Sequence, residues 1–163
     1  MDLLSYIPNN LSDVLLKIIR FTELRRDVLY QNVHNVMTTD FRPQDMPVIE
    51  FAAVLHAAVV EHIQKHRLIF CDTDNIRFGS NGSMEVRAVH DERAEGLLQE
   101  DRDAYIEYQM NRLLENALNR KLAKELLRLA GGIDVDATGL HVNSKPAASE
   151  ANEKPWGHGN DLD

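Results

Sequence analysis

The chain has 163 residues, of which 44% are hydrophobic and 6% aromatic, and its formal net charge is −8. This length suits one domain with or without tails, and the acidic charge argues against a general nucleic-acid binder, which needs a basic surface. Cys71 is the only cysteine, which excludes an intramolecular disulfide and a thiolate zinc cluster.

The N-terminal segment, residues 1–9, is expected to be flexible. It has an acidic second residue and a break at Pro8, and it lacks the basic stretch and long apolar core of a cleaved secretory signal. Charges interrupt every apolar run well short of the ~20 residues that a membrane span needs. The default prediction is therefore a cytoplasmic protein without membrane insertion, unless export follows a route that leaves no cleaved signal.

Residues 10–36 are predicted to form a long amphipathic helix. Asn10 can cap it after the break at Pro8, and Asp13 suits the positive end of the helix. Apolar residues then recur every three or four positions, and Arg25 interrupts their stripe. Because such a helix is stable mainly when its apolar face is covered, it requires a partner.

Residues 41–100 are predicted to be a small mixed insert. It begins with an extended segment that contains two prolines and continues with a helix over 48–66. The sequences RLIFC and NIRFGSNGSMEVRAV are predicted strands, and Gly79 and Gly82 supply the turn of a β-hairpin in the second of them. Residues 91–100 are highly charged, and their pattern leaves their structure open.

A second long helix is predicted over residues 101–130. Most of its residues are good helix formers, and the pair Gly131-Gly132 supplies a stop. Its apolar residues recur at helical spacing, and Ala117 and Ala123 would permit close approach of another helix. The predicted fold is thus mainly α, with the two long helices pairing as a coiled-coil-like bundle within a domain that covers residues 10–133.

The remaining segment, residues 134–163, is predicted to be a disordered acidic tail. It is rich in small and polar residues and has no lasting periodicity. Six acidic residues and two lysines give it a charge of −4, half of the net −8. Trp156 in this tail is either a short docking motif or a chance tryptophan.

The sequence offers little catalytic chemistry. His62 and His66 are four positions apart and could share a zinc ion on one helix face, but no third ligand is evident nearby. Asp72 and Asp74 lack the glycine and closing glutamate of a calcium loop, which favours a short acidic turn. No nucleophile elbow or phosphate-binding glycine loop is present. We therefore expect no enzyme, no cofactor, no metal and no small-molecule substrate.

The end of the first long helix resembles a signature of bacterial flagellar rod and hook proteins, roughly N-x-A-N-x-x-T-P-G-[YF]-[KR]. The residues that match it in register are Asn32, Asn35, Thr38, Phe41 and Arg42. His34 replaces the family's alanine, and Thr39-Asp40 replaces Pro-Gly. Because aspartate tolerates left-handed backbone better than most residues, the turn can persist in a modified form.

The second long helix resembles the C-terminal helix of the proximal-rod (FlgB-type) members of this family. The residues that fit its pattern are Ile106, Glu107, Met110, Asn116, Ala117 and Leu118. The short chain and the small central insert also suit the proximal-rod type better than the longer distal-rod or hook proteins. The two resemblances together cover about residues 11–133.

The resemblance implies a structural subunit of the basal-body rod, which assembles helically and forms part of the drive shaft for motility. It further implies synthesis in the cytoplasm and type III export without a cleaved signal. The implied partners are copies of the chain itself and other rod, basal-body and export-gate proteins. The helices would meet within the chain or between neighbours through Ile18, Phe21, Leu29, Val33, Ile106, Met110, Leu113 and Ala117.

Two other classes of protein stay open. A helical adaptor or chaperone-like protein would use the same apolar stripes without polymerising. A metal-dependent enzyme would use His62, His66, Asp72 and Asp74. Export from a flagellated cell would separate the rod subunit from the adaptor, and bound metal after purification would favour the enzyme.

Overall fold

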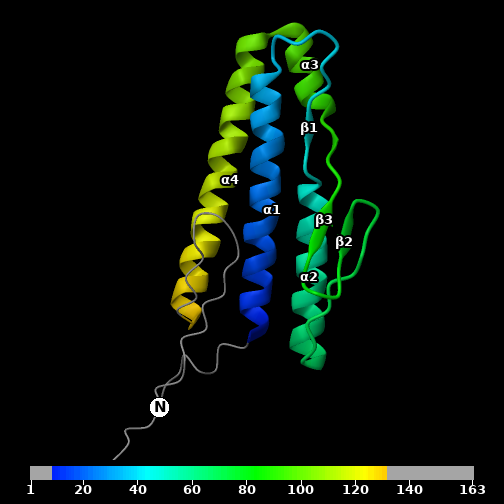
Figure 1. Ribbon diagram of the computed structural model, residues 1–163, viewed down its shortest axis with the longest axis vertical. Coiled ribbons are helices and arrows are strands. Elements are labelled where there is room, and N and C mark those ends of the chain that lie inside the picture. The colour runs from blue at the N-terminus through cyan, green and yellow to red at the C-terminus, as the bar shows by residue number, and fades with distance from the viewer. Residues whose placement is uncertain (1–8, 132–163) are drawn as a thin grey trace, which may run out of the picture.

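The computed structural model describes residues 9–131, which form four helices and two small antiparallel sheets (Figure 1). The expectation of a mainly α protein with a small antiparallel insert is confirmed. Residues 1–8 and the predicted acidic tail lie outside the described residues. Within the described part of the chain, no helix is long and apolar enough to cross a membrane.

Two long helices, α1 (Asn9–His34) and α4 (Arg102–Gly131), lie side by side and run in opposite directions (Figure 1). Toward the chain ends of this pair, Leu15 and Ile19 of α1 pack with Ala123 and Leu127 of α4 in an apolar cluster. All four side chains are almost fully buried. The small side chain of Ala123 lets the two helices approach closely here.

The opposite side of α1 packs against the insert. Phe21 stacks on Phe51 of α2 (Val48–Lys65), with ring centroids 4.0 Å apart. Met46, Ile76 and Met84 complete this second apolar cluster. Helix α1 is therefore the central layer of the fold, with α4 on one side and the insert on the other.

The insert contains four short strands. Strands β1 (Gln44–Asp45) and β4 (Val89–His90) pair with each other, and β2 (Ile76–Phe78) pairs with β3 (Met84–Val86). The second pair is the predicted hairpin. Gly82 in its turn has a φ of +79°, which glycine adopts without strain.

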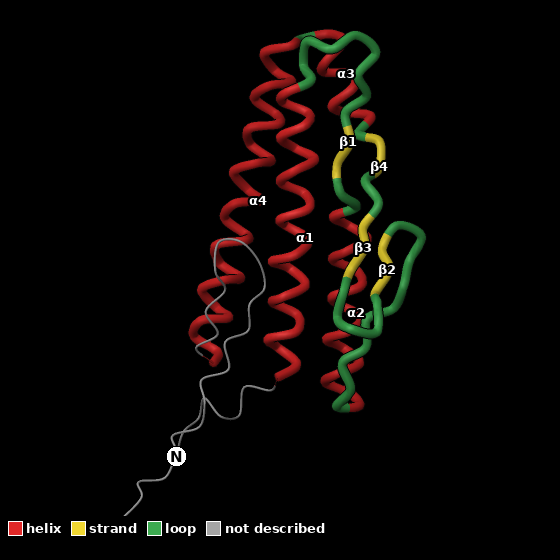
Figure 2. Tube along the Cα trace, in the orientation of Figure 1, coloured by secondary structure: helices red, strands yellow, loops and turns green. Residues whose placement is uncertain are grey.

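The prediction of a strand at RLIFC is wrong, because residues 67–73 form a loop (Figure 2). A strand needs a neighbouring strand for its backbone hydrogen bonds, and β2 finds its partner in β3 instead. The loop is held by side chains. Phe70 stacks on Phe78 at 5.3 Å, and the ammonium group of Lys17 lies 5.9 Å and 5.7 Å from these two rings.

The charged segment that the sequence left open forms α3 (Glu92–Glu100). Asp91 caps it by accepting a hydrogen bond from the backbone N–H of Ala94, and Glu92 and Glu95 lie in its first turn. Acidic residues at these positions stabilise the positive end of a helix. Asp101 caps α4 in the same way through the N–H groups of residues 103 and 104.

Candidate assembly site

Asn32, the first asparagine of the helix-end motif, ties three elements together. It is only 1% exposed, and its amide exchanges two hydrogen bonds with the backbone of Gln44 in β1, at 2.7 Å and 3.1 Å. Its Nδ2 also donates to Gln109 of α4 at 3.1 Å. The Tyr105 hydroxyl donates to the Asn32 carbonyl at 2.9 Å, and burial raises the pKa of Tyr105 to about 12, so this donor stays protonated.

Asn35 and Thr38 instead form a local turn at the end of α1. Asn35 donates from Nδ2 to the carbonyl of Gln31 at 2.9 Å, and its Oδ1 accepts from the Thr38 hydroxyl at 3.2 Å. Thr38 also donates its backbone N–H to the Asn35 carbonyl, and Phe41 donates to the Thr38 carbonyl. The motif thus divides into one buried tether, Asn32, and one surface turn.

The two asparagines are expected to differ strongly in their effect on stability. Asn32→Ala removes the side-chain hydrogen bonds to the Gln44 backbone in β1 and to Gln109 in α4. Each buried group left unpaired costs about 1–3 kcal/mol, so we expect a loss of about 3 kcal/mol. Asn35→Ala, its matched control at the surface, should lose about 1 kcal/mol or less. Urea unfolding followed by circular dichroism measures both, and equal losses would contradict the tether.

The backbone at Asp40 is left-handed, with a φ of +58°. Asp40 stands where the flagellar signature has glycine, the residue that adopts this conformation most easily. Aspartate tolerates it better than most other residues. Beside it, Arg42 reaches Glu95 of α3 at 3.5 Å, so the last motif residue connects the turn to the insert.

Substitutions at Asp40 test whether the turn requires this conformation. Asp40→Gly should leave the free energy of unfolding within about 0.5 kcal/mol of the wild type, whereas Asp40→Ala should lower it by about 1 kcal/mol. Thermal or urea unfolding of the two variants gives the comparison. A tolerated alanine would mean that the turn relaxes to another conformation without loss.

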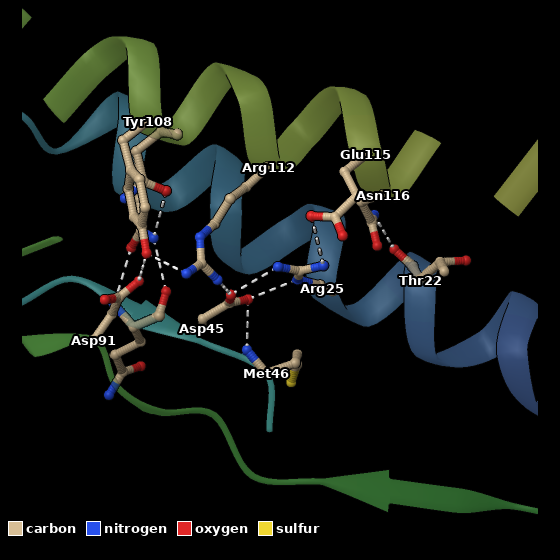
Figure 3. Close-up of polar contacts among 12 residues, drawn as sticks. Thr22, Arg25, Asp45, Met46, Asp91, Tyr108, Arg112, Glu115 and Asn116 are labelled. Carbon is tan, nitrogen blue, oxygen red and sulfur yellow. Dashed lines mark hydrogen bonds and ion pairs between the residues drawn. The ribbon is translucent and has the colours of Figure 1, made fainter. Parts of the chain in front are cut away.

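A row of polar contacts connects α1 with α4, and we call it the polar seam (Figure 3). At its centre Asp45 of β1 accepts two hydrogen bonds from Arg25, at 2.8 Å and 2.9 Å, and also pairs with Arg112 of α4. Arg25 and Asp45 are 4% and 5% exposed. The arginine that interrupts the apolar stripe of α1 is therefore a buried ion-pair partner.

The polar seam continues on both sides of Asp45. Asn116 donates to the Thr22 carbonyl at 2.7 Å, and Arg120 pairs with Glu23 at 2.7 Å. On the other side, Arg112 contacts the Tyr108 hydroxyl. Hydrogen bonds to charged groups require a defined geometry, so they set the register of one helix against the other as well as the distance between them. Polar groups therefore hold α4 against α1 along one part of the contact, and the apolar cluster of Leu15, Ile19, Ala123 and Leu127 holds it along another.

The opposite side of α4 exposes large apolar side chains. We call them the leucine stripe, and they follow one another every three or four positions: Met110, Leu114, Leu118, Leu122, Leu126 and Leu129. Each is between 44% and 60% exposed. A row of large apolar side chains at helical spacing is typical of a protein-binding surface.

The residues expected at the helix interface differ in their burial and in the helix that they face. Leu29 is buried, and Ile18, Val33, Ile106 and Leu113 are half-buried. Phe21 faces α2 through its stacking on Phe51, not α4. Met110 and Ala117 are exposed. Phe21 thus does not meet Met110 or Ala117 within the chain, and these two exposed residues are available to a neighbour.

The candidate metal ligands lie apart from this region. His66 ends α2 in a left-handed conformation, and its ring lies edge-on to that of His62 with centroids 6.5 Å apart. Asp72 accepts a hydrogen bond from the backbone of Phe78 at 2.8 Å, as a turn residue does. Among residues 9–131, no group of three or more histidine, cysteine or acidic side chains is arranged to hold a metal ion.

Comparison of the chain with protein-family models, with curated protein sequences and with solved structures found no match. The function is therefore argued from features of this structure alone. They are the helix-end motif, the polar seam and the leucine stripe. Sequence periodicity identified the stripe residues as apolar, but not that they face away from α1.

Proposed function

We propose that this chain is a structural subunit that polymerises through its long helices, of the flagellar proximal-rod type. The observation that carries this proposal is the leucine stripe, six large apolar side chains that stay 44% to 60% exposed along α4. Exposed apolar surface is stabilised when a neighbour covers it. In a rod, every subunit supplies that neighbour to the next one.

The helix-end motif supports the choice of family. Asn32 and Asn35 match the signature in register, and the backbone at Asp40 has the left-handed φ that suits the signature's glycine. Asp40 thus adopts the left-handed conformation at the position where the signature has glycine. The left-handed φ at Asp40 supports a modified form of the signature's turn in which Pro-Gly is absent.

The coiled-coil-like contact is proposed to form between copies, not between α1 and α4 of one chain. Within the chain, α1 and α4 meet through polar contacts, such as that of Asn116 with Thr22, and through the apolar cluster of Leu15, Ile19, Ala123 and Leu127. The stripe leucines lie on another face of α4 and have the spacing of a helix-packing surface. A contact between two different surfaces of identical copies builds a helical filament when its rotation does not close into a ring.

Replacement of the chromosomal gene in the source organism tests the proposal. Met110→Asp places a charge on the stripe, and it should abolish basal-body rods and motility while the protein is still made. Ile63→Asp is the matched control, because Ile63 is 70% exposed on α2 and lies outside the stripe. We also expect Asn35→Ala to block rod assembly through its loss of the turn at the end of α1.

Normal motility and intact rods in the Met110→Asp strain would contradict the proposal. Export of the protein into the medium by a flagellated cell supports the rod subunit over an adaptor. Retention in the cytoplasm, in a stable complex of fixed stoichiometry, would favour the adaptor instead.

A further inference from the structure

A groove of about 450 Å³ runs between α1 and the part of α4 that begins at Leu113. Arg26 and Tyr30 line it from α1, and residues between Leu113 and Arg128 line it from α4. Its wall contains five cationic side chains and one carboxylate, Glu125, in a chain whose net charge is −8. We call it the basic groove. An acidic segment is the ligand that its charge favours.

The cations of the basic groove differ in how far they are neutralised. Three arginines already pair with carboxylates: Arg26 with Asp27, Arg120 with Glu23, and Arg128 with Glu125. Among residues 9–131, neither Lys121 nor Lys124 forms an ion pair at contact distance. Lys121 lies near enough to Glu125 to contribute, after Arg128, to the lowered pKa of that carboxyl. The groove also has an apolar wall, since Leu113, Ala117 and the 58% exposed ring of Tyr30 line it. It can therefore receive an acidic segment that also contains an aromatic side chain.

The chain itself supplies such a segment. Residues 134–163 contain six acidic residues against two lysines, and they contain Trp156, the only tryptophan. This segment begins three positions after the last helical residue, Gly131, and Arg128 of the groove lies three positions before it. Its charge of −4 complements the basic groove, and its tryptophan complements the apolar wall.

The length of the segment also matches the groove. From Gly131 back to Ala117 the helix rises about 21 Å, at 1.5 Å per residue. Trp156 is 25 positions from Gly131. Random-coil linkers of about 25 residues have a root-mean-square end-to-end distance of about 25–30 Å. Effective concentration is highest when the length of a linker matches the span, so binding within the chain is favoured over binding between chains.

We propose that residues 134–163 bind the basic groove of their own chain, with their carboxylates near Lys121 and Lys124 and Trp156 against Tyr30 and Ala117. Lys121 follows Leu118 by three positions and Leu114 by seven, so the groove borders the leucine stripe. The bound segment therefore competes with a second copy for this side of α4. Given the proposed rod function, it holds the subunit as a monomer until assembly displaces it.

Fluorescence of Trp156 in the full chain tests the binding directly, because no other tryptophan contributes. At low salt we expect an emission maximum at shorter wavelength than in the urea-unfolded chain, and independent of protein concentration. Lys121→Glu/Lys124→Glu should shift it to the unfolded position. Adding Glu150→Lys/Glu153→Lys to that variant should restore the short wavelength, because the charges are then exchanged. Lys65→Glu/Arg67→Glu, with the same change in net charge on α2 and its loop, should have no effect.

Three results would overturn the proposal. They are a native emission maximum equal to that of the unfolded chain, no response to Lys121→Glu/Lys124→Glu, and a maximum that changes with protein concentration, which would mean binding to another copy. The regulatory role is tested by light scattering, where Glu150→Gln/Glu153→Gln should associate several-fold faster than the wild type. If Trp156 responds as expected but neither the wild type nor any variant associates, the binding of residues 134–163 to the basic groove is supported and the proposed rod function is contradicted.

Discussion

Replacing Asp45 by alanine is expected to lower the free energy of unfolding by about 3–5 kcal/mol. Asp45 neutralises both Arg25 and Arg112, and Arg25 is only 4% exposed. Without the carboxylate, the buried Arg25 guanidinium keeps its charge and retains only Glu115, which lies 4.0 Å away and is 64% exposed. Loss of the buried partner is the most destabilising way to break a buried ion pair. The backbone N–H of Met46 also loses its acceptor, the Asp45 carboxylate.

Two further variants test whether the loss of stability comes from an unpaired buried charge or from a general loss of packing. Glu23→Ala breaks the pair with Arg120, whose side chain is 23% exposed, and should cost about 1 kcal/mol or less. Arg25→Met/Asp45→Leu/Arg112→Met removes all three charges and should be more stable than Asp45→Ala alone, because no buried charge is left unpaired. Urea unfolding with linear extrapolation gives the values. A loss below about 1 kcal/mol for Asp45→Ala would contradict a buried ion pair at this position.

Leu118→Asp/Leu122→Asp is expected to abolish self-association while it leaves the monomer folded. Both side chains are more than half exposed in the monomer, at 58% and 59%. Substitution of exposed residues changes the free energy of unfolding by about 0.5 kcal/mol or less at each site. An interface of two apolar helix faces, in contrast, would bury two charges without partners, and that cost prevents association.

Sedimentation velocity over a range of protein concentrations measures this effect, and circular dichroism checks that the helices remain. Ile49→Asp/Ile63→Asp is the matched control, because these two isoleucines are 87% and 70% exposed on α2. Association that persists in Leu118→Asp/Leu122→Asp, or that is lost equally in the control, would exclude the leucine stripe as the interface.

Local signals in the sequence were sufficient to predict several helices and strands. The long apolar periodicity and the glycines at 131 and 132 predicted α4, and Gly79 and Gly82 predicted the hairpin turn. Helix α3 was missed, although Asp91 followed by Glu92 and Glu95 has the pattern of an acidic helix start. RLIFC was predicted as a strand because its residues favour strands, but that preference does not supply a paired neighbour.

The contacts of Asn32 and of the polar seam could not be predicted from such local signals. Asn32 lies 77 positions from Gln109, and Asn116 lies 94 positions from Thr22. A hydrogen bond between such residues depends on which faces of two helices meet, and periodicity along one helix contains no information about that choice. The motif that contains Asn32 marked it as unusual, but not as a buried tether.

The sequence by itself determined that this protein has two long amphipathic helices, a small insert between them and an excess of acid after residue 133. It also determined which residues of α4 are apolar. Only the tertiary structure decided that α4 turns its amide and arginine groups toward α1 and leaves Leu114 and Leu118 exposed. The physical reason is that buried polar groups require specific partners, and α1 and β1 supply them, whereas apolar side chains can be covered by any apolar neighbour.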